Sequence, residues 1–254
     1  MIEKIQNNPN NFKIQFLYYK RARDAIFDVV NELSERGYED IYIPGYIGWS
    51  PKEGSGIFDP LNAIPNLKRH YYKMKRSLKV DLENLKKQLV DRSVVLVVNY
   101  FGFRDPRLTE IIDFVHNKDC IVIEDNAHGF YTYFCKGSTG ADITVFSLHK
   151  MFPFTQGGGM IIEKGQFSQL HNLEEPVQFN PFRYNYNEIA KVRIENYRCL
   201  LSIAENFRDY FEPLRDAVFL GSNVPQTFPI IIKRGDRNSI YEIMNTAGYG
   251  VVSL

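Results

Sequence analysis

The strongest constraint on the fold is the alternation of short apolar runs with amphipathic segments in the middle of the chain. The run VVLVV at 94–98 is continuously apolar, as in a strand that is buried on both faces of a sheet. Residues 105–117 carry apolar side chains at helical spacing, and a second apolar run, CIVIED, follows at 120–125. ITVFS at 143–147 and GMIIE at 159–163 supply two further strands. This order predicts a parallel sheet that is flanked by helices.

The segments on either side of this region extend the pattern toward both ends of the chain. Toward the N-terminus we expect a helix at about 22–37, a strand at 40–46, a long loop from 45 to about 66, a strand at 70–75 and a helix over 82–89. Toward the C-terminus we expect a long helix near 187–212, with one apolar stripe of Tyr197, Leu200, Ala204, Phe207 and Phe211, then a strand at 228–233 and a helix near 237–246.

These elements predict an α/β protein with two parts. Residues 1–190 are expected to form a large three-layer α/β/α domain around a mostly parallel sheet. Residues 191–254 are expected to supply a bridging helix and a small, partial C-terminal α+β lobe.

The composition argues against several classes of protein. A net charge of +1 gives no electrostatic reason to expect nucleic acid or an anionic membrane as a partner. No apolar run approaches the ~18 residues that span a bilayer, and the first 13 residues lack the apolar core of a secretion signal. Cys120, Cys135 and Cys199 are far apart and support neither a disulfide framework nor a zinc site. We therefore expect a soluble, cytoplasmic protein without a metal site.

Three polar clusters directly follow predicted strands, at 99–102, 124–128 and 147–150. Ligands of parallel α/β sheets bind at the carboxyl ends of the strands, so these clusters are candidates for one site. Asp125 alone could equally cap a helix, and Lys150 alone could be a solvated surface charge. The glycine run at 157–159 favours function, because glycine lets the backbone approach a ligand or another strand closely.

An aspartate and a lysine that project from neighbouring strand ends can serve one cofactor, pyridoxal phosphate. The lysine amine forms a Schiff base with the cofactor, and the carboxylate pairs with the protonated pyridine nitrogen. Lys150 and Asp125 are the candidates for these two roles. Ser147 could donate its hydroxyl to the phosphate, or it could be a structural serine that is bonded to backbone.

These motifs resemble the DegT/DnrJ/StrS family of sugar aminotransferases, which are fold-type-I pyridoxal-phosphate enzymes. The resemblance runs from about Tyr18 to Leu254. It is carried by three stretches in order, NYFGFRDP at 99–106, IEDNAHG at 123–129 and FSLHKMFPFTQGGGM at 146–160. Weaker similarities are RARDAI at 21–26, IPGY at 43–46 and RIENY at 193–197.

The resemblance implies a role for each of these site residues. Lys150 corresponds to the Schiff-base lysine and proton shuttle, and Asp125 to the partner of the ring nitrogen. His128 falls where the family has His or Gln near the 3-hydroxyl of the cofactor, and Ser147 corresponds to a phosphate ligand.

Two further parts of the cofactor site are implied near the N-terminus. Backbone amides of Arg21 and Ala22, at the start of the first helix, would help to hold the phosphate. Tyr46 or Trp49 would stack on the pyridine ring, although the family position for stacking corresponds to Gly48.

The sequence departs from the family in three places. Arg21-Ala22 replaces a Ser-Gly phosphate turn, so the phosphate contacts are altered or use the arginine charge. The segment between 165 and 196 is shorter than usual, and the second lobe ends at Leu254 where family members continue.

The resemblance implies an aminotransferase that acts on a nucleotide-linked keto sugar in polysaccharide or lipopolysaccharide precursor synthesis, with glutamate as amino donor, as a homodimer. The alternative is a relative that binds pyridoxal phosphate without transaminating, or a non-catalytic relative. Ser147-x-x-Lys150 also fits the nucleophile and base of a penicillin-binding site, but the S-D-N and K-T-G elements of such sites do not follow. A Rossmann dehydrogenase is not supported, because the glycine run precedes a strand rather than a helix.

Overall fold

The computed structural model describes residues 15–49, 54–167, 169–173 and 180–251. Its described residues form a sheet with the strand order β1-β7-β6-β5-β4-β2-β3. The strands are β1 (Phe16–Tyr19), β2 (Asp40–Pro44), β3 (Lys68–Tyr72), β4 (Val94–Val98), β5 (Ile121–Asn126), β6 (Ile143–Ser147) and β7 (Gly158–Ile162). The neighbours β3, β2, β4, β5 and β6 run parallel, whereas β7 is antiparallel to both β6 and β1. The predicted mostly parallel sheet is confirmed.

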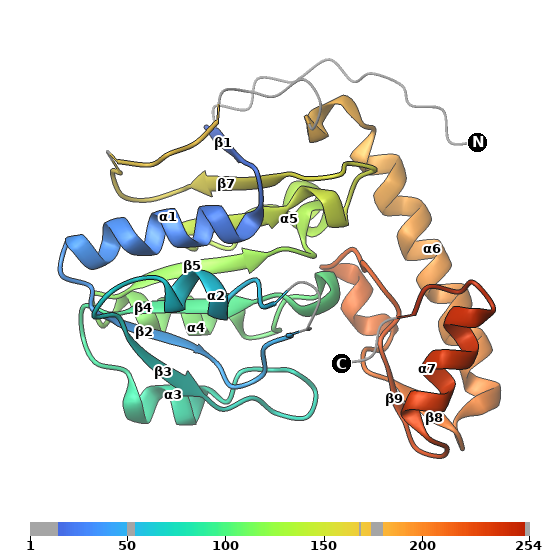
Figure 1. Ribbon diagram of the computed structural model, residues 1–254. Helices are drawn as coiled ribbons and strands as arrows, with labels where there is room; N and C mark the ends of the chain where they lie inside the picture. The colour runs from blue at the N-terminus through green and yellow to red at the C-terminus, as the bar shows by residue number, and fades with distance from the viewer. Residues whose placement is uncertain (1–14, 50–53, 168, 174–179, 252–254) are drawn as a thin grey trace.

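Helices cover both faces of the sheet (Figure 1). On one face lie α1 (Ala22–Glu35) and α2 (Phe58–Asn62), and on the other lie α3 (Leu82–Gln88), α4 (Leu108–His116) and α5 (Phe130–Lys136). The predicted three-layer α/β/α architecture is therefore confirmed.

The β4 strand shows why apolar runs form the centre of this sheet. Val94 and Leu96 pack into the cluster beneath α1 and α2, while Val95 and Val97 pack against α3 and α4. Side chains alternate between the two faces of a strand, so a strand covered on both faces must be apolar at every position. The expectation that VVLVV is buried on both faces is confirmed.

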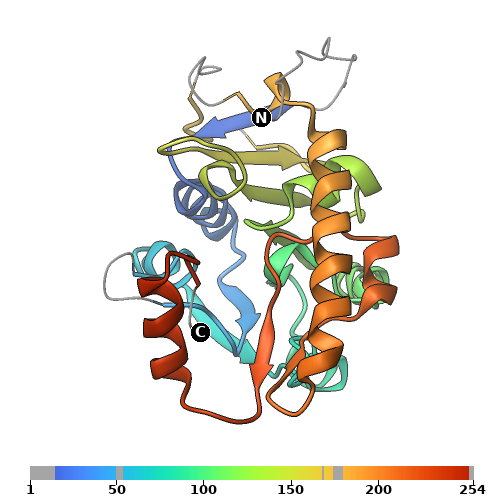
Figure 2. The ribbon, with the colours of Figure 1, turned by 90° about the vertical axis from the view of Figure 1, so that its right-hand side faces the viewer.

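The C-terminal elements lie at the end of the sheet toward which β5 points (Figure 1). They comprise α6 (Tyr186–Ala204), a two-stranded antiparallel sheet of β8 (Phe211–Pro213) and β9 (Ile230–Ile232), and α7 (Arg237–Thr246). Figure 2, which faces this end, shows α6 and α7 on either side of β9. The expected α+β lobe is present. The predicted domain boundary at 190/191 falls inside α6, and the division into two domains stays a prediction.

The long helix expected near 187–212 is confirmed as far as Ala204 and is wrong only over its last eight residues, 205–212. It ends at Ala204, a 3-10 turn follows at Glu205–Phe207, and Phe211 begins β8, where it pairs with Ile232. The rings of Phe207 and Phe211 lie 6.2 Å apart at 13°. Apolar residues four apart are typical of a helix face, but here the two rings stack across a turn.

Four strands and helices were missing from the sequence-based expectations, namely β1, α2, α5 and β8. The loop expected from 45 to 66 contains α2, a five-residue helix that is too short to show a helical period. The α5 sequence FYTYFCK is rich in aromatic residues, which favour strands, and its first four residues are all buried. The strand expected at 70–75 begins and ends earlier, at β3.

None of the described helices is long and apolar enough to cross a membrane.

Candidate active site

Asp125 lies at the carboxyl end of β5, on the face that α1 and α2 cover. Asp125 is two residues from Ile123, which packs beneath those helices, so the two side chains share one face of β5. Asp125 is only 5% exposed. The Ala127 N–H donates to its Oδ1 at 2.8 Å, and its side chain accepts no other hydrogen bond from the described residues. Burial raises the pKa of Asp125, while the Ala127 bond and the charge of Lys150 oppose that rise. A buried carboxylate with one oxygen that accepts no hydrogen bond favours a cationic N–H group as its partner.

Lys150 and His128 come together from the turns that follow β6 and β5. Lys150 Nζ lies 3.4 Å from His128 Nε2, and the Phe101 N–H donates to His128 Nδ1 at 3.3 Å. Burial and the Lys150 charge lower the pKa of His128 to about 3, so the ring is neutral at neutral pH. Because Nδ1 accepts a hydrogen bond, the ring proton is assigned to Nε2, which can donate to the Lys150 nitrogen only when that amine is neutral.

The Tyr100–Gly102 turn after β4 supports His128 from the other side. Phe101 has φ 61, a left-handed conformation that residues with side chains adopt rarely. Its ring lies parallel to the His128 ring, at 6.1 Å and 12°. The turn therefore fixes the imidazole through both its backbone and its side chain.

The N-terminus of α1 lies against the ends of β6 and β7. Ser147 pairs in register with Gly158, and a Cβ on Gly158 would lie 2.4 Å from the Arg21 carbonyl carbon and 2.6 Å from the Ala22 nitrogen. Only glycine permits this approach, which sets the first amides of a 14-residue helix beside the Ser147 hydroxyl. Such an arrangement suits an anion such as a phosphate group.

The side chain of Arg21 is directed toward its own helix. Its guanidinium forms an ion pair with Asp24 at 3.0 Å and is 55% exposed. The Ser147 Oγ lies 3.2 Å from His149 Nδ1. The candidate phosphate site therefore consists of the backbone amides at the start of α1 and the Ser147 hydroxyl, without the Arg21 guanidinium.

The two candidates for ring stacking lie in different surroundings. Tyr46 is half-buried, its ring packs on Tyr100 at 5.7 Å, and its carbonyl accepts a hydrogen bond from the Tyr100 hydroxyl. Tyr100 in turn lies close enough to Asp125 for that carboxylate to raise the pKa of Tyr100, after burial, the larger cause. Trp49 is 65% exposed. Tyr46 is thus the candidate that the structure connects to Asp125.

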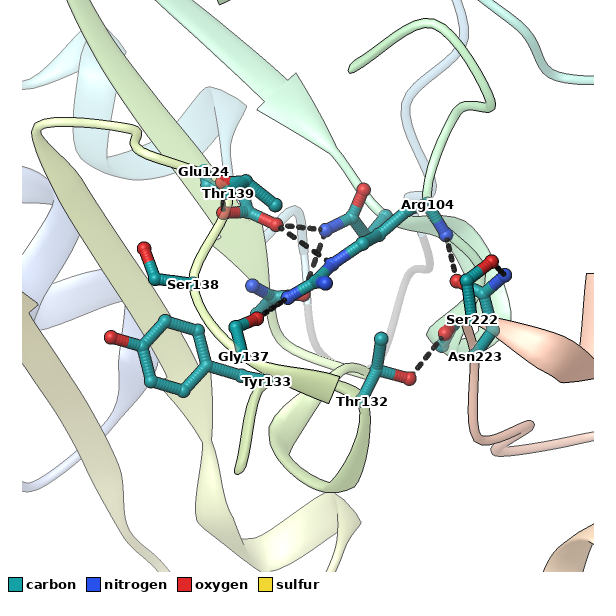
Figure 3. Close-up of polar contacts among 12 residues, drawn as sticks. Arg104, Glu124, Thr132, Tyr133, Gly137, Ser138, Thr139, Ser222 and Asn223 are labelled. Atoms are coloured by element: carbon teal, nitrogen blue, oxygen red, sulfur yellow. Dashed lines mark hydrogen bonds and ion pairs between the residues drawn. The ribbon is translucent and has the colours of Figure 1, made fainter. Parts of the chain in front are cut away.

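A buried ion pair of Glu124 and Arg104 lies near the end of β5 (Figure 3). Because side chains alternate along a strand, Glu124 lies on the opposite face of β5 from Asp125. Glu124 is fully buried and accepts hydrogen bonds from Asn99 Nδ2 and Thr139 Oγ1, both at 2.5 Å. The Arg104 Nε lies 3.7 Å from the same carboxylate, and burial lowers the pKa of Arg104 while Glu124 opposes that shift. A buried carboxylate needs such partners, and together they fix the end of β5.

Sequence reasoning placed Glu124 in a polar cluster but assigned it no role. The available signal was the alternation of side chains along IEDNAHG, which sends Glu124 and Asp125 to opposite faces.

The structure thus brings Lys150, Asp125 and His128 to one end of the sheet, with Ser147 and the start of α1 alongside. These groups fit pyridoxal phosphate: a buried carboxylate with an open oxygen for the ring nitrogen, an amine for the aldehyde and a helix N-terminus for the phosphate. No group of acidic, histidine or cysteine side chains among the described residues could hold a metal ion.

The fold is of the pyridoxal-phosphate-dependent transferase-like class, which it shares with solved structures of low sequence identity. The family model of the DegT/DnrJ/EryC1/StrS aminotransferases matches residues 73–169, which include β4, β5, β6 and Lys150. This match confirms the resemblance to that family and supports pyridoxal phosphate as the cofactor. No curated protein sequence matches the chain.

Three solved structures illustrate the similarity of fold. The sugar aminotransferase CalS13 from Micromonospora echinospora has a TM-score of 0.64 and 13% identity over 92% of this chain and 72% of its own. The 3-amino-5-hydroxybenzoic acid synthase has a TM-score of 0.67 and 14% identity over 92% of this chain and 68% of its own. A NifS-like protein has a TM-score of 0.64 and 15% identity over 93% of this chain and 69% of its own. At these identities the likeness shows the fold alone.

Proposed function

We propose that this chain is a pyridoxal-phosphate-dependent aminotransferase in which Lys150 binds the cofactor covalently. The observation that carries the proposal is the approach of Lys150 Nζ to His128 Nε2, 3.4 Å, at the sheet edge that also holds the buried Asp125. When bound, pyridoxal phosphate supplies the electron sink on which amino-group transfer depends. Lys150 would hold the cofactor through its amine, which is a nucleophile in its neutral form.

The other residues of the site have distinct roles in this proposal. Asp125 holds the proton on the ring nitrogen, because a cationic N–H compensates the burial that raises the pKa of this carboxyl. Neutral His128 holds its Nε2–H beside the Lys150 amine, and by the family resemblance it would contact the 3-hydroxyl of the cofactor. Ser147 and the first amides of α1, at Arg21 and Ala22, hold the phosphate.

The ring is covered by an aromatic side chain in this proposal. We place Tyr46 in that role ahead of Trp49, because Tyr46 packs on Tyr100 and so connects to Asp125.

The proposal extends to the substrates of the enzyme and to its oligomeric state. We assign a nucleotide-linked keto sugar as amino acceptor and glutamate as donor, in the synthesis of polysaccharide or lipopolysaccharide precursors. The family match and the fold shared with a sugar aminotransferase support this choice. We further propose a homodimer that works in the cytoplasm, and the free state of Cys120, Cys135 and Cys199 fits a reducing compartment.

The decisive test is reduction of the cofactor complex with borohydride, followed by mass mapping. Purified protein with added pyridoxal phosphate is expected to absorb visible light, and the reduced label is expected on Lys150. Lys150→Ala should lose both signals while its unfolding free energy stays within about 1 kcal/mol of wild type, since the side chain is exposed. Lys191→Ala, an exposed lysine on α6, is the matched control and should keep both signals.

A label on another lysine that persists in Lys150→Ala would contradict the assignment. Amino transfer from glutamate to a nucleotide-linked keto sugar, followed by chromatography of the sugar product, tests the activity. Cofactor labelling of Lys150 without transfer to any keto sugar would instead identify a cofactor-binding protein that does not transaminate.

A further inference from the structure

Gln226 connects the two turns that carry the proposed site. It lies between the C-terminal 3-10 turn at Ala217–Gly221 and β9. Its side-chain Nε2 donates to the Lys150 carbonyl at 2.6 Å, and its backbone N–H donates to the Phe101 carbonyl at 2.8 Å. One residue from the C-terminal region therefore bonds to the backbone of both turns.

These bonds close a ring of four residues. Gln226 bonds to Phe101, the Phe101 N–H donates to His128 Nδ1 at 3.3 Å, and His128 Nε2 faces Lys150 Nζ at 3.4 Å. The Lys150 carbonyl then accepts from Gln226. The two ends of Lys150, its carbonyl and its amine, are thus held by groups that are themselves joined through Phe101.

The segment around Gln226 is fixed in place independently of this ring. The Arg193 NH1 from α6 donates to the Gln226 carbonyl at 3.0 Å. Two residues earlier, the Val224 N–H donates to Thr132 Oγ1 at 2.8 Å. A Cβ on Gly102 would lie 2.5 Å from the Val224 carbonyl oxygen and 3.1 Å from the Gln226 nitrogen, so the turn and the segment are in close contact.

The orientation of the Gln226 amide follows from its partner. The Lys150 carbonyl can only accept a hydrogen bond, so the Gln226 nitrogen must face it. The Gln226 Oε1 is then buried and has no hydrogen-bond partner in the described part of the chain. Burial of a polar atom without a partner costs stability, so the Oε1 atom does not explain a glutamine at this position. The Nε2–H donor to the Lys150 carbonyl does explain it.

We infer that Gln226 is a positioning residue, which holds the Lys150 turn and, through Phe101, sets the geometry between the Lys150 amine and His128. This inference rests on the proposed function, because it assigns Lys150 to the cofactor. It concerns residues of this chain that do not themselves touch the reacting atoms.

The test replaces the donor and keeps the size of the side chain. Gln226→Met removes both polar atoms, and Gln226→Glu replaces the donor with an acceptor-only carboxylate. Thr227→Val, at the exposed neighbouring position, is the matched control. Three quantities are measured for each protein: the pH midpoint of the visible absorbance with added pyridoxal phosphate, the dissociation constant of pyridoxal phosphate, and the tautomer of His128 by ¹⁵N NMR in the cofactor-free protein.

In both Gln226 variants we expect the pH midpoint to shift by at least half a unit and the dissociation constant of pyridoxal phosphate to rise about tenfold, about 1.4 kcal/mol of binding free energy. We expect the Nε2–H tautomer of His128 to stay as in wild type, because the backbone N–H of residue 226 still bonds to the Phe101 carbonyl in both variants. Thr227→Val should match wild type in all three measurements.

Some outcomes would overturn the inference. Variants that melt at a lower temperature but keep the wild-type pH midpoint and cofactor affinity would make Gln226 a structural residue, as would failure of both variants to fold. If wild type itself forms no visible complex or carries its label away from Lys150, the proposed function fails. If wild type is labelled on Lys150 and the variants are unchanged, only the positioning role fails.

Discussion

His128 illustrates how burial can decide the charge of a single residue. Its ring accepts the Phe101 N–H and faces Lys150, whose positive charge adds to the effect of burial on the imidazole pKa. Asp125 shows the opposite case, a carboxyl whose pKa burial raises. Burial thus shifts both residues toward their neutral forms, and a cationic ring nitrogen beside Asp125 would oppose that shift for the carboxyl alone.

The pH dependence of stability should report the His128 environment. The folded-state pKa of about 3 lies below the ordinary value of 6.5, so the unfolded chain binds a proton that the folded chain does not. Folding stability should therefore fall as the pH drops below 6.5, by at most about 1.4 kcal/mol per pH unit, until the pH reaches the folded-state pKa. Urea unfolding of wild type and His128→Gln at pH 7, 6 and 5 measures this difference.

His128→Gln has no imidazole to protonate, so its stability should change less than that of wild type over the same pH range. Comparison of the two slopes removes the contribution of the other histidines, which are shared. Equal slopes for the two proteins would show that the ring titrates freely in the folded state.

At the scale of elements, the sequence predicted the strands that are buried on both faces and failed where burial follows another pattern. VVLVV and ITVFS coincide with β4 and β6, because a covered strand must be apolar throughout. The α5 helix was not predicted, since it is enclosed on several sides and its aromatic residues show no helical period. The end of α6 was misplaced because ring stacking of Phe207 and Phe211 imitates helical spacing.

The contact between α1 and β7 should be sensitive to a single methyl group. Gly158→Ala places a Cβ 2.4 Å from the Arg21 carbonyl carbon, a backbone atom that can move only with the start of α1. We expect a loss of roughly 1–3 kcal/mol of unfolding free energy and weaker binding of pyridoxal phosphate, because the phosphate cradle opens. Thermal unfolding and a cofactor titration measure the two effects.

Gly221→Ala is the control, because a Cβ there meets no atom within 4 Å. The sequence shows a run of three glycines at 157–159, which indicates a close backbone contact, but it does not predict that α1 makes this contact. A Gly158→Ala protein with wild-type affinity for the cofactor would show that the α1 amides do not hold the phosphate.

At the scale of the whole molecule, the C-terminal region closes the site from the end of the sheet. Gln226 lies 76 residues beyond Lys150 in the sequence, yet it bonds to that residue directly. No local pattern identifies such a contact, since neither periodicity nor a motif marks residue 226. The strand-end cluster of Lys150, Asp125 and His128 was predictable because parallel strands share one edge, whereas its supports come from segments that only the tertiary fold brings near.

The last prediction concerns assembly. If the chain is a homodimer and a partner helps to complete the cofactor site, then binding of pyridoxal phosphate and association must strengthen each other by the same factor. We expect dimers at micromolar concentration and a dissociation constant of the dimer that falls about tenfold with saturating cofactor, which corresponds to about 1.4 kcal/mol of coupling. Sedimentation equilibrium over a concentration series, with and without pyridoxal phosphate, measures both quantities.

Lys150→Ala serves as the matched control, because it should dimerise like the cofactor-free protein whether or not pyridoxal phosphate is added. Monomers alone at micromolar concentration would contradict the dimer, and a dimer whose stability ignores the cofactor would show that the partner does not contribute to the site.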